Sequence, residues 1–130
     1  EGLTVSDLLN KLKITKQSLN RVFLIGRLGE DPVGKTTPAG LSVTTFSLAT
    51  NESWKNEDLS TIEHVEWHSL YATGPLADFA EGALKRGQLI FIEGSLRART
   101  WKEGGYQRKK FEILCKTITP LERKTDKNKK

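Results

Sequence analysis

The chain has 130 residues, of which 36% are hydrophobic and 28% are charged, so it can form one domain with a modest core but not two. It contains no run of 18 apolar residues, which excludes a membrane-spanning helix and predicts a soluble protein with no membrane partner. The single cysteine, Cys115, excludes an internal disulfide and has no thiol or histidine near it in sequence, so no metal site and no cofactor are predicted.

The net charge of +5 is unevenly distributed along the chain. Residues 1–94 contain 9 basic and 12 acidic side chains, whereas residues 95–116 contain 7 and 2, and residues 117–130 contain 5 and 2. An excess of positive charge in the last third of the chain is typical of a surface that binds a polyanion. A basic surface that serves only solubility is the alternative.

Residues 1–18 are predicted to form an N-terminal arm outside the domain. Leu8, Leu9 and Leu12 recur at helical spacing after Thr4 and Asp7, which stand at the positions of a helix-capping box. A short amphipathic helix and a disordered arm both fit this pattern. The first residues lack the charged head and apolar run of a secretory signal, and earlier removal of a transit peptide is compatible with them.

Three β-strands are predicted next, at residues 21–28, 41–50 and 65–72, because these runs are rich in β-branched and aromatic residues. The segment between the first two strands contains Gly34, Pro38 and Gly40 and is expected to be a loop. Residues 51–63, between the second and third strands, are polar and are also expected to form an exposed loop.

One helix is predicted inside the domain. Pro75 is suited to its first turn, and Gly87 after two basic residues is a typical stop signal. Its apolar face recurs at helical spacing and comprises Leu76, Phe79, Ala80, Ala83 and Leu84. Two further strands, at residues 88–101 and 106–119, flank a short connection with two glycines, which predicts a β-hairpin.

The predicted order of three strands, one helix and two strands is that of the OB-fold, a five-stranded Greek-key barrel with a helix between its third and fourth strands. The fold class is therefore all-β with one helix, and the barrel domain is assigned to residues 19–119. Residues 120–130 form a basic tail with few apolar residues and are expected to be disordered.

The predicted hairpin carries basic and aromatic side chains in rows. Because alternate residues of a strand share a face, Arg97, Arg99 and Trp101 point together on its first strand. On the second strand the residues that share a face are Tyr106, Arg108 and Lys110, while those expected to enter the core are Phe111, Ile113 and Cys115. Rows that mix cations with rings favour nucleic-acid binding over a role in solubility alone.

Two more tryptophans lie outside this hairpin. Trp54 stands at the edge of the predicted polar loop, and in the third predicted strand one face holds Trp67, Ser69, Tyr71 and Thr73. The unpaired bases of a single-stranded nucleic acid stack on such rings without regard to sequence. The alternative is that the tryptophans fill the barrel, which explains one of them better than all three.

Four segments, at residues 20–32, 46–54, 66–68 and 85–101, resemble the bacterial and mitochondrial single-stranded DNA-binding proteins in sequence, order and spacing. They include the runs Arg-Val-Phe-Leu-Ile-Gly-Arg-Leu-Gly at 21–29 and Gly-Ser-Leu-Arg-Ala-Arg-Thr-Trp at 94–101. The resemblance extends over about residues 19–121. Several blocks in one order are far more specific than any single motif.

The resemblance implies that the chain binds and protects single-stranded DNA without sequence specificity during replication, repair and recombination, by wrapping it over a homotetramer. Trp54, Trp67 and Trp101 stand at the family's base-stacking positions, and His68 stands at a position associated with subunit contacts. The residues expected to meet phosphates are Arg97, Arg99, Arg108 and Lys110. No enzymatic activity is expected, and replication proteins such as a helicase and a polymerase are the expected protein partners.

The chain departs from the family pattern at two places. The family often has a stacking phenylalanine six residues after the second tryptophan, where this chain has Thr73, and Tyr71 on the same face is the candidate replacement. Bacterial members typically end in an acidic tail with an apolar tip, whereas this chain ends in basic residues 127–130. This ending is closer to the mitochondrial form and predicts a mitochondrial location, with a truncated tail in the bacterial cytoplasm as the alternative.

Two other classes of function compete with this interpretation. An enzyme or metal protein would have to use His64 and His68, which lie about 13 Å apart if both belong to one strand that rises roughly 3.3 Å per residue. No nucleophile motif or phosphate-binding loop accompanies them. An OB-fold RNA chaperone or a small replication accessory protein is the other alternative, and the three tryptophans disfavour the accessory role.

Overall fold

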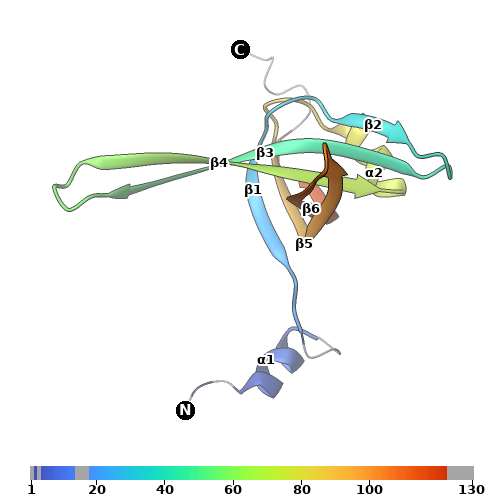
Figure 1. Cartoon of the computed structure of the whole chain (residues 1–130). Coiled ribbons are helices and arrows are strands. Elements are labelled where there is room, and N and C mark those ends of the chain that lie inside the picture. The colour runs from blue at the N-terminus through green and yellow to red at the C-terminus, as the bar shows by residue number, and fades with distance from the viewer. Residues whose placement is uncertain (1, 3, 14–17, 123–130) are drawn as a thin grey trace.

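The computed structural model describes residues 2, 4–13 and 18–122, and residues 123–130 of the predicted tail lie outside this range. Residues 120–122 of that tail are ordered, and the N–H of Leu121 donates to the carbonyl of Leu89 at 2.9 Å, so the prediction of disorder was wrong for them. Its elements are α1 (Val5–Lys11), β1 (Val22–Leu28), β2 (Val33–Thr36), β3 (Ser42–Lys55), β4 (Thr61–Thr73), α2 (Pro75–Ala83), β5 (Leu89–Glu103) and β6 (Tyr106–Pro120) (Figure 1). No helix within the described residues is long and apolar enough to cross a membrane.

Five of the strands close into a barrel. They are hydrogen-bonded in the order β1-β5-β6-β4-β3, and an additional pairing between β1 and β3 completes the ring. All pairings are antiparallel except the one between β4 and β6. Helix α2 connects the third and fourth strands of the barrel, β4 and β5, which confirms the predicted OB-fold with one helix inside the domain.

Closure of the barrel depends on a close approach of β1 to β3. The two strands pair only where Arg27 and Leu28 lie opposite Ala49 and Leu48. A Cβ atom at Gly26 would collide with the backbone oxygen of Ala49, so only glycine lets the strands come this close.

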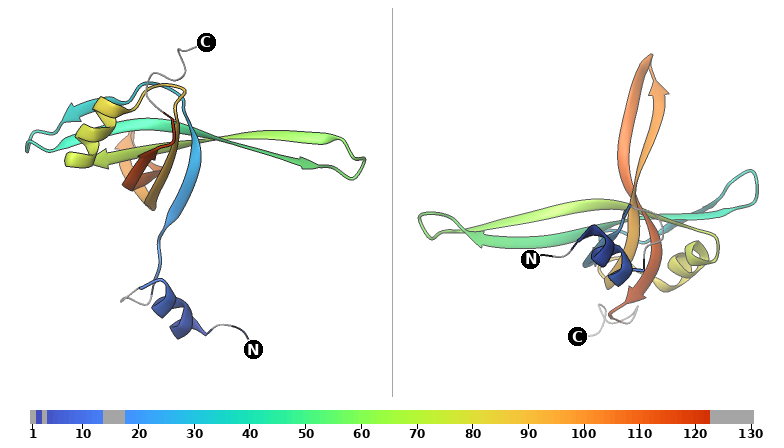
Figure 2. Two further views of the ribbon diagram at one scale, coloured as in Figure 1. Left: turned by 180° about the vertical axis from the view of Figure 1, so that it is seen from behind. Right: turned by 90° about the horizontal axis from the view of Figure 1, so that it is seen from below.

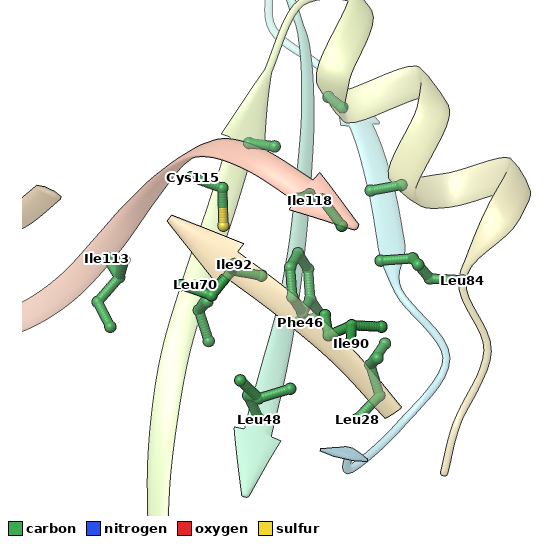
Figure 3. Close-up of a cluster of buried hydrophobic side chains, with 13 residues drawn as sticks. Leu28, Phe46, Leu48, Leu70, Leu84, Ile90, Ile92, Ile113, Cys115 and Ile118 are labelled. Atoms are coloured by element: carbon green, nitrogen blue, oxygen red, sulfur yellow. The ribbon is translucent and has the colours of Figure 1, made fainter. Parts of the chain in front are cut away.

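The core lies inside the barrel and beneath α2 (Figure 3). Leu48, Ile90 and Ile92 are fully buried at its centre. Helix α2 packs against this core through the small, buried side chains of Ala77 and Ala80. The buried hydroxyl of Thr44 donates a hydrogen bond of 2.8 Å to the carbonyl of Ala77. Phe79, which the helical pattern placed on the apolar face, is 41% exposed, so that part of the predicted face is wrong.

A β-bulge in β6 lets residues of different parity reach the core. Glu93 pairs with Thr117 and Gly94 with Cys115, so Lys116 is an extra residue without a partner on β5. Cys115 before the bulge and Ile118 after it are both buried as a result.

Strand β2 was missed by the sequence prediction, which had a loop there. It pairs with residues 42–45 at the outer edge of β3, so four strands rather than three precede α2. Its four residues, Val33–Thr36, include Gly34 and only one strongly apolar side chain, and the strand forms because an edge of β3 is available to it.

The predicted loop at residues 51–63 was wrong. β3 and β4 continue their pairing to Lys55 opposite Thr61, and only residues 56–60 connect them. We call residues 51–55 and 61–65 the β3–β4 arm. Both of its faces lack a covering layer, so its polar composition resembles that of a loop although its backbone forms a regular ladder.

A second two-stranded extension arises from β5 and β6. We call residues 96–103 and 106–111 the β5–β6 arm, and Figure 2 shows that the two arms leave the barrel in different directions. Ile113 and Cys115 are buried as predicted, but Phe111 is 56% exposed, so its assignment to the core was wrong. The alternation of the strand continues past the barrel, where no opposing layer exists to bury the ring.

Helix α1 begins at the predicted capping box. The backbone N–H of Asp7 donates to the Thr4 hydroxyl at 3.0 Å, and the N–H of Thr4 donates to the Asp7 carboxylate at 3.2 Å. Residues 4–13 therefore adopt the first of the two alternatives for the arm. Figure 1 shows α1 beyond the N-terminal end of β1, away from the barrel.

The buried thiol provides a test of the core. Burial raises the pKa of Cys115 from 9.0 to about 12, so its modification by a thiol reagent at pH 8 should be about 1,000-fold slower in the folded protein than in urea. Because the folded pKa is the higher one, the contribution of the thiol to the free energy of unfolding is complete below pH 9 and is lost as the pH rises toward 12. Equal rates of modification in both states would contradict the buried placement.

Candidate nucleic-acid interface

One face of the β5–β6 arm carries the predicted rows of cations and rings. The register pairs Arg99 with Lys110, Trp101 with Arg108, and Glu103 with Tyr106, and so brings both strands' rows to the same face. We call this the front face, and its members are Arg97, Arg99, Trp101, Tyr106, Arg108 and Lys110. The guanidinium carbon of Arg99 lies 4.9 Å from the centre of the Trp101 ring, which is a cation–π contact.

Two carboxylates neutralise part of the front face. The Arg99 Nε donates to Glu112 at 3.2 Å, and Lys110 Nζ lies 4.0 Å from the same carboxylate, whose side chain is only 15% exposed. Nearer the tip, Arg108 and Glu103 form an ion pair at 3.6 Å. The carboxylate of Glu112 thus lies between the cations of Arg99 and Lys110, where an external anion such as a phosphate could otherwise bind. This role of Glu112 was not predicted from the sequence, although its spacing two residues after Lys110 places both side chains on one face.

The front face continues into the outer surface of β3 and β4 through three adjoining hollows. The residues that line the first include Thr45, Tyr71, Arg97, Ala98, Arg99, Thr100 and Glu112. Those that line the second include Glu30, Asp31, Thr45, Ser47, Ser69, Arg99, Lys110 and Glu112, and the third is lined by Gly29, Glu30, Ser47 and Trp67. Because neighbouring hollows share residues, they form one continuous path, which we call the track. The track places Tyr71 at one end and Trp67 at the other, and between them lie the cations of Arg99 and Lys110 and the carboxylates of Glu30, Asp31 and Glu112.

Trp67 is 58% exposed and lies against the backbone of the chain. A Cβ atom at Gly29 would stand 2.6 Å from Cζ3 of the Trp67 ring, so a larger residue there would push the ring away. Glycine at this position therefore lets Trp67 lie close to the barrel surface.

Trp54 does not share the face of Trp67. It is 48% exposed on the β3–β4 arm, opposite Ile62, and its ring centre lies 6.4 Å from that of His64. Alternation along β3 puts Trp54 on the side that holds Leu48 inside the barrel, whereas Trp67 is on the outer side. A single-stranded nucleic acid that contacts both tryptophan rings must therefore pass from one side of the β3–β4 sheet to the other.

The two histidines lie on β4, and each contacts a neighbouring polar side chain. His68 Nε2 lies 2.9 Å from the hydroxyl of Thr50, on the same side of the sheet as the core. The exposed carboxylate of Glu66 accepts a hydrogen bond from His64 at 3.0 Å, and this bond lowers the pKa of Glu66. Within the described ranges, no three metal-ligating side chains form a cluster.

The fold and this surface define a class of protein: an OB-fold barrel whose exposed rings and cations suit a single-stranded nucleic acid. Residues 19–121 match the model of the single-strand binding protein family, and the chain belongs to this family. Its relatives include the single-stranded DNA-binding protein 1 of Chlorobaculum tepidum, 41% identical over 81% of this chain and 66% of that protein. The protein of the same name from Xylella fastidiosa is 41% identical over 86% of this chain and 84% of its own length.

Solved structures agree with the match. The Plasmodium falciparum SSB in complex with ssDNA superposes with a TM-score of 0.77 at 30% identity, over 84% of this chain and all of that one. The wild-type single-stranded DNA binding protein from Thermus aquaticus gives a TM-score of 0.71 at 35% identity, over 80% of this chain and 50% of that one.

The relatives differ from this chain in length and bear on one of the predictions from sequence. The chain spans 66% of the Chlorobaculum tepidum protein and 60% of a Neisseria meningitidis relative, so it covers less than two thirds of either. These relatives are bacterial, and the predicted closeness to the mitochondrial form is not supported by them.

Glu112 offers a test of the electrostatics of the front face. Replacing its carboxylate, as in Glu112→Gln, frees Arg99 and Lys110 for phosphates and should tighten the binding of oligo-dT by about two- to fivefold, since a partly exposed ion pair is worth less than about 1 kcal/mol. The salt dependence of binding should steepen at the same time.

The matched control for this variant is Glu103→Gln. Its side chain is 66% exposed and Arg108 is its only ion-pair partner among the described residues, so this variant should change the affinity less. Salt titrations followed by tryptophan fluorescence measure both effects. Weaker binding by Glu112→Gln would mean that the carboxylate positions the cations and does not compete for them.

Proposed function

We propose that this chain binds and protects single-stranded DNA without sequence specificity, as a homotetramer that acts in replication, repair and recombination, and that it catalyses no reaction. The observation that carries the proposal is the track from Trp67 to Tyr71, with Arg97, Arg99 and Lys110 beside it. Exposed rings recognise bases that are not paired, and the cations recognise the phosphates that every oligomer has.

Each predicted contact residue has a part in this proposal. Trp54, Trp67 and Trp101 stack on bases, and their exposure of 36% or more leaves ring surface free for this contact. Tyr71 replaces the ring that is missing at Thr73, because it lies in the track beside two arginines. The phosphate-binding residues are Arg97, Arg99, Arg108 and Lys110.

An exposed apolar surface supports self-association. Phe23 and Ile25 on the outer side of β1 are 58% and 57% exposed, and the Phe23 ring stacks on that of Phe91 with centres 6.3 Å apart. Between Val22 and Gly26, β1 pairs with β5 alone among the described strands, which leaves one of its edges available to a second copy. Exposed aromatic rings beside an unpaired edge of β1 form a surface that can pack against the same surface of a second copy of this chain. His68 contributes to subunit contacts in the same proposal.

The compartment and the protein partners are further parts of the proposal. The bacterial relatives favour the bacterial cytoplasm, and the mitochondrial alternative rests on residues 127–130, which lie outside the described residues. The proposed protein partners are replication proteins such as a helicase and a polymerase.

The proposed function is tested by titrating tryptophan fluorescence with oligo-dT. Binding should be tight, nearly independent of base sequence and weakened by salt, and duplex DNA should compete poorly. An RNA oligomer of matched sequence serves as a second competitor and separates a DNA-binding protein from an RNA chaperone. Equal affinity for duplex and single-stranded DNA would contradict the proposed function.

Two groups of variants divide the binding energy in the same assay. Arg97→Ala and Arg99→Ala should each reduce the salt slope by about 0.7, because each removes one phosphate contact to a single strand. The alanine variants of Trp54, Trp67 and Trp101 should each cost roughly 1 to 3 kcal/mol, the range known for OB-folds that bind single-stranded DNA, with the slope unchanged. Tyr71→Ala should behave like the tryptophan variants. If it binds as the parent does, Thr73 leaves a gap in the stacking surface.

The assembly is tested by light scattering at micromolar concentration, where the parent should have the mass of a tetramer. Phe23→Asp puts a charge on the apolar surface of β1 and should lower the mass. Leu59→Asp is the matched control, because Leu59 is 76% exposed in the loop at the tip of the β3–β4 arm, and it should leave the mass unchanged. A parent that is monomeric would contradict the tetramer.

A further inference from the structure

The face of the β5–β6 arm opposite Trp101 contributes only Ala98 and Thr100 to the track, at its Tyr71 end. We call it the back face, and its members are Leu96, Ala98, Thr100, Lys102, Gln107, Lys109 and Phe111. The register pairs Ala98 with Phe111 and Thr100 with Lys109, so these residues of the two strands share one face. This face continues the side of β5 and β6 that holds Ile92 and Ile113 in the core.

Phe111 on the back face has surroundings similar to those of Trp101 on the front face. Its side chain is 56% exposed, against 36% for Trp101. Lys109 Nζ lies 5.1 Å from the centre of the Phe111 ring, as the Arg99 guanidinium lies 4.9 Å from that of Trp101. Each face of the arm thus presents an open ring with a cation from the same strand beside it.

The two faces differ in how their cations are neutralised. Between residues 96 and 112 the acidic residues are Glu103 and Glu112, and both are on the front side, where they pair with Arg99, Arg108 and Lys110. The back face has Lys102 and Lys109, no acidic residue, and no ion pair to either lysine within the part of the chain that the structure describes. Its charge is therefore positive and uncompensated.

This charge decides which occupant fits the back face. A second copy docked through the same surface would bring Lys102 and Lys109 against their own counterparts, which is repulsive. A polyanion with flat apolar groups satisfies both the lysines and the ring. Trp54 has an equivalent place, because it too is an exposed ring where the core-facing side of a hairpin continues past the barrel.

We propose that the back face is a second binding site for single-stranded DNA, in which a base stacks on Phe111 and phosphates contact Lys109 and Lys102. This inference rests on the proposed function of the chain. The β5–β6 arm then has single strand on both faces, and a DNA molecule occupies the back face only when it is long enough to extend beyond the track. Phe111 consequently affects the binding of long oligomers and not that of short ones.

The experiment compares an oligo-dT of about 8 nucleotides, within the range that one OB-fold binds, with one of about 60 nucleotides. Phe111→Ala should leave the affinity for the short oligomer within about twofold of the parent and weaken the long one by about 5- to 150-fold. Leu96→Ala is the matched control, because Leu96 is an exposed apolar residue of the same face without a ring, and it should have little effect on either. Thermal unfolding checks that both variants are folded.

A second variant reports on the ring directly. Phe111→Trp keeps a stacking surface and adds a fluorophore, so it should bind both oligomers as the parent does. It should also show extra quenching with the long oligomer and none with the short one.

Three results would overturn the second site. One is a Phe111→Ala protein that matches the parent at both lengths while Phe111→Trp shows no extra quenching. Another is equal weakening at both lengths, which would place Phe111 in the primary site. The third is a Phe111→Ala protein whose mass is lower than that of the tetramer, which would show that the back face forms a contact between copies of the chain. In each case, failure of the proposed function itself is recognised separately, because the parent protein would then fail to bind oligo-dT.

Discussion

Backbone pairing that continues beyond the barrel is the constraint on which the binding surface depends. A strand inside the barrel has one face in the core and one in solvent, but β3 with β4 and β5 with β6 stay paired where no core remains. The ladder of hydrogen bonds satisfies the polar backbone there, so the side chains of both faces are free for other contacts. Large rings such as Trp54 and Trp101 are therefore exposed on regular structure and not on a loop.

The barrel could be predicted because residues that are buried recur in the sequence with the period of a strand or a helix. Residues of β1, β5 and the inner part of β3 alternate between core and surface, and α2 has its apolar residues at helical spacing. The same rule failed where burial ends. The polar residues 51–63 have no apolar periodicity, and Phe111 keeps the periodicity of the core after the core has stopped. The short strand β2 depends on an edge of β3 that no local pattern reveals.

The candidate site shows the same division. Alternation alone predicted that Arg97, Arg99 and Trp101 point together, because this relation holds within one strand. The position of Glu112 between two cations and the placement of Trp54 and Trp67 on opposite sides needed the register between strands. The track itself combines β3, β4 and the β5–β6 hairpin, so its course is a property of the closed barrel and not of any segment.

Ile113 and Cys115, which precede the bulge at Lys116, limit how this hairpin can vary in length among related chains. Because Ile113 and Cys115 fix the parity of β6 where it leaves the barrel, inserting one residue into one strand of the arm would exchange the faces of every residue beyond the insertion. Insertions or deletions of two residues in a strand would preserve the faces. We therefore expect natural length variants of this arm to differ by even numbers of residues per strand, unless a second bulge restores the parity.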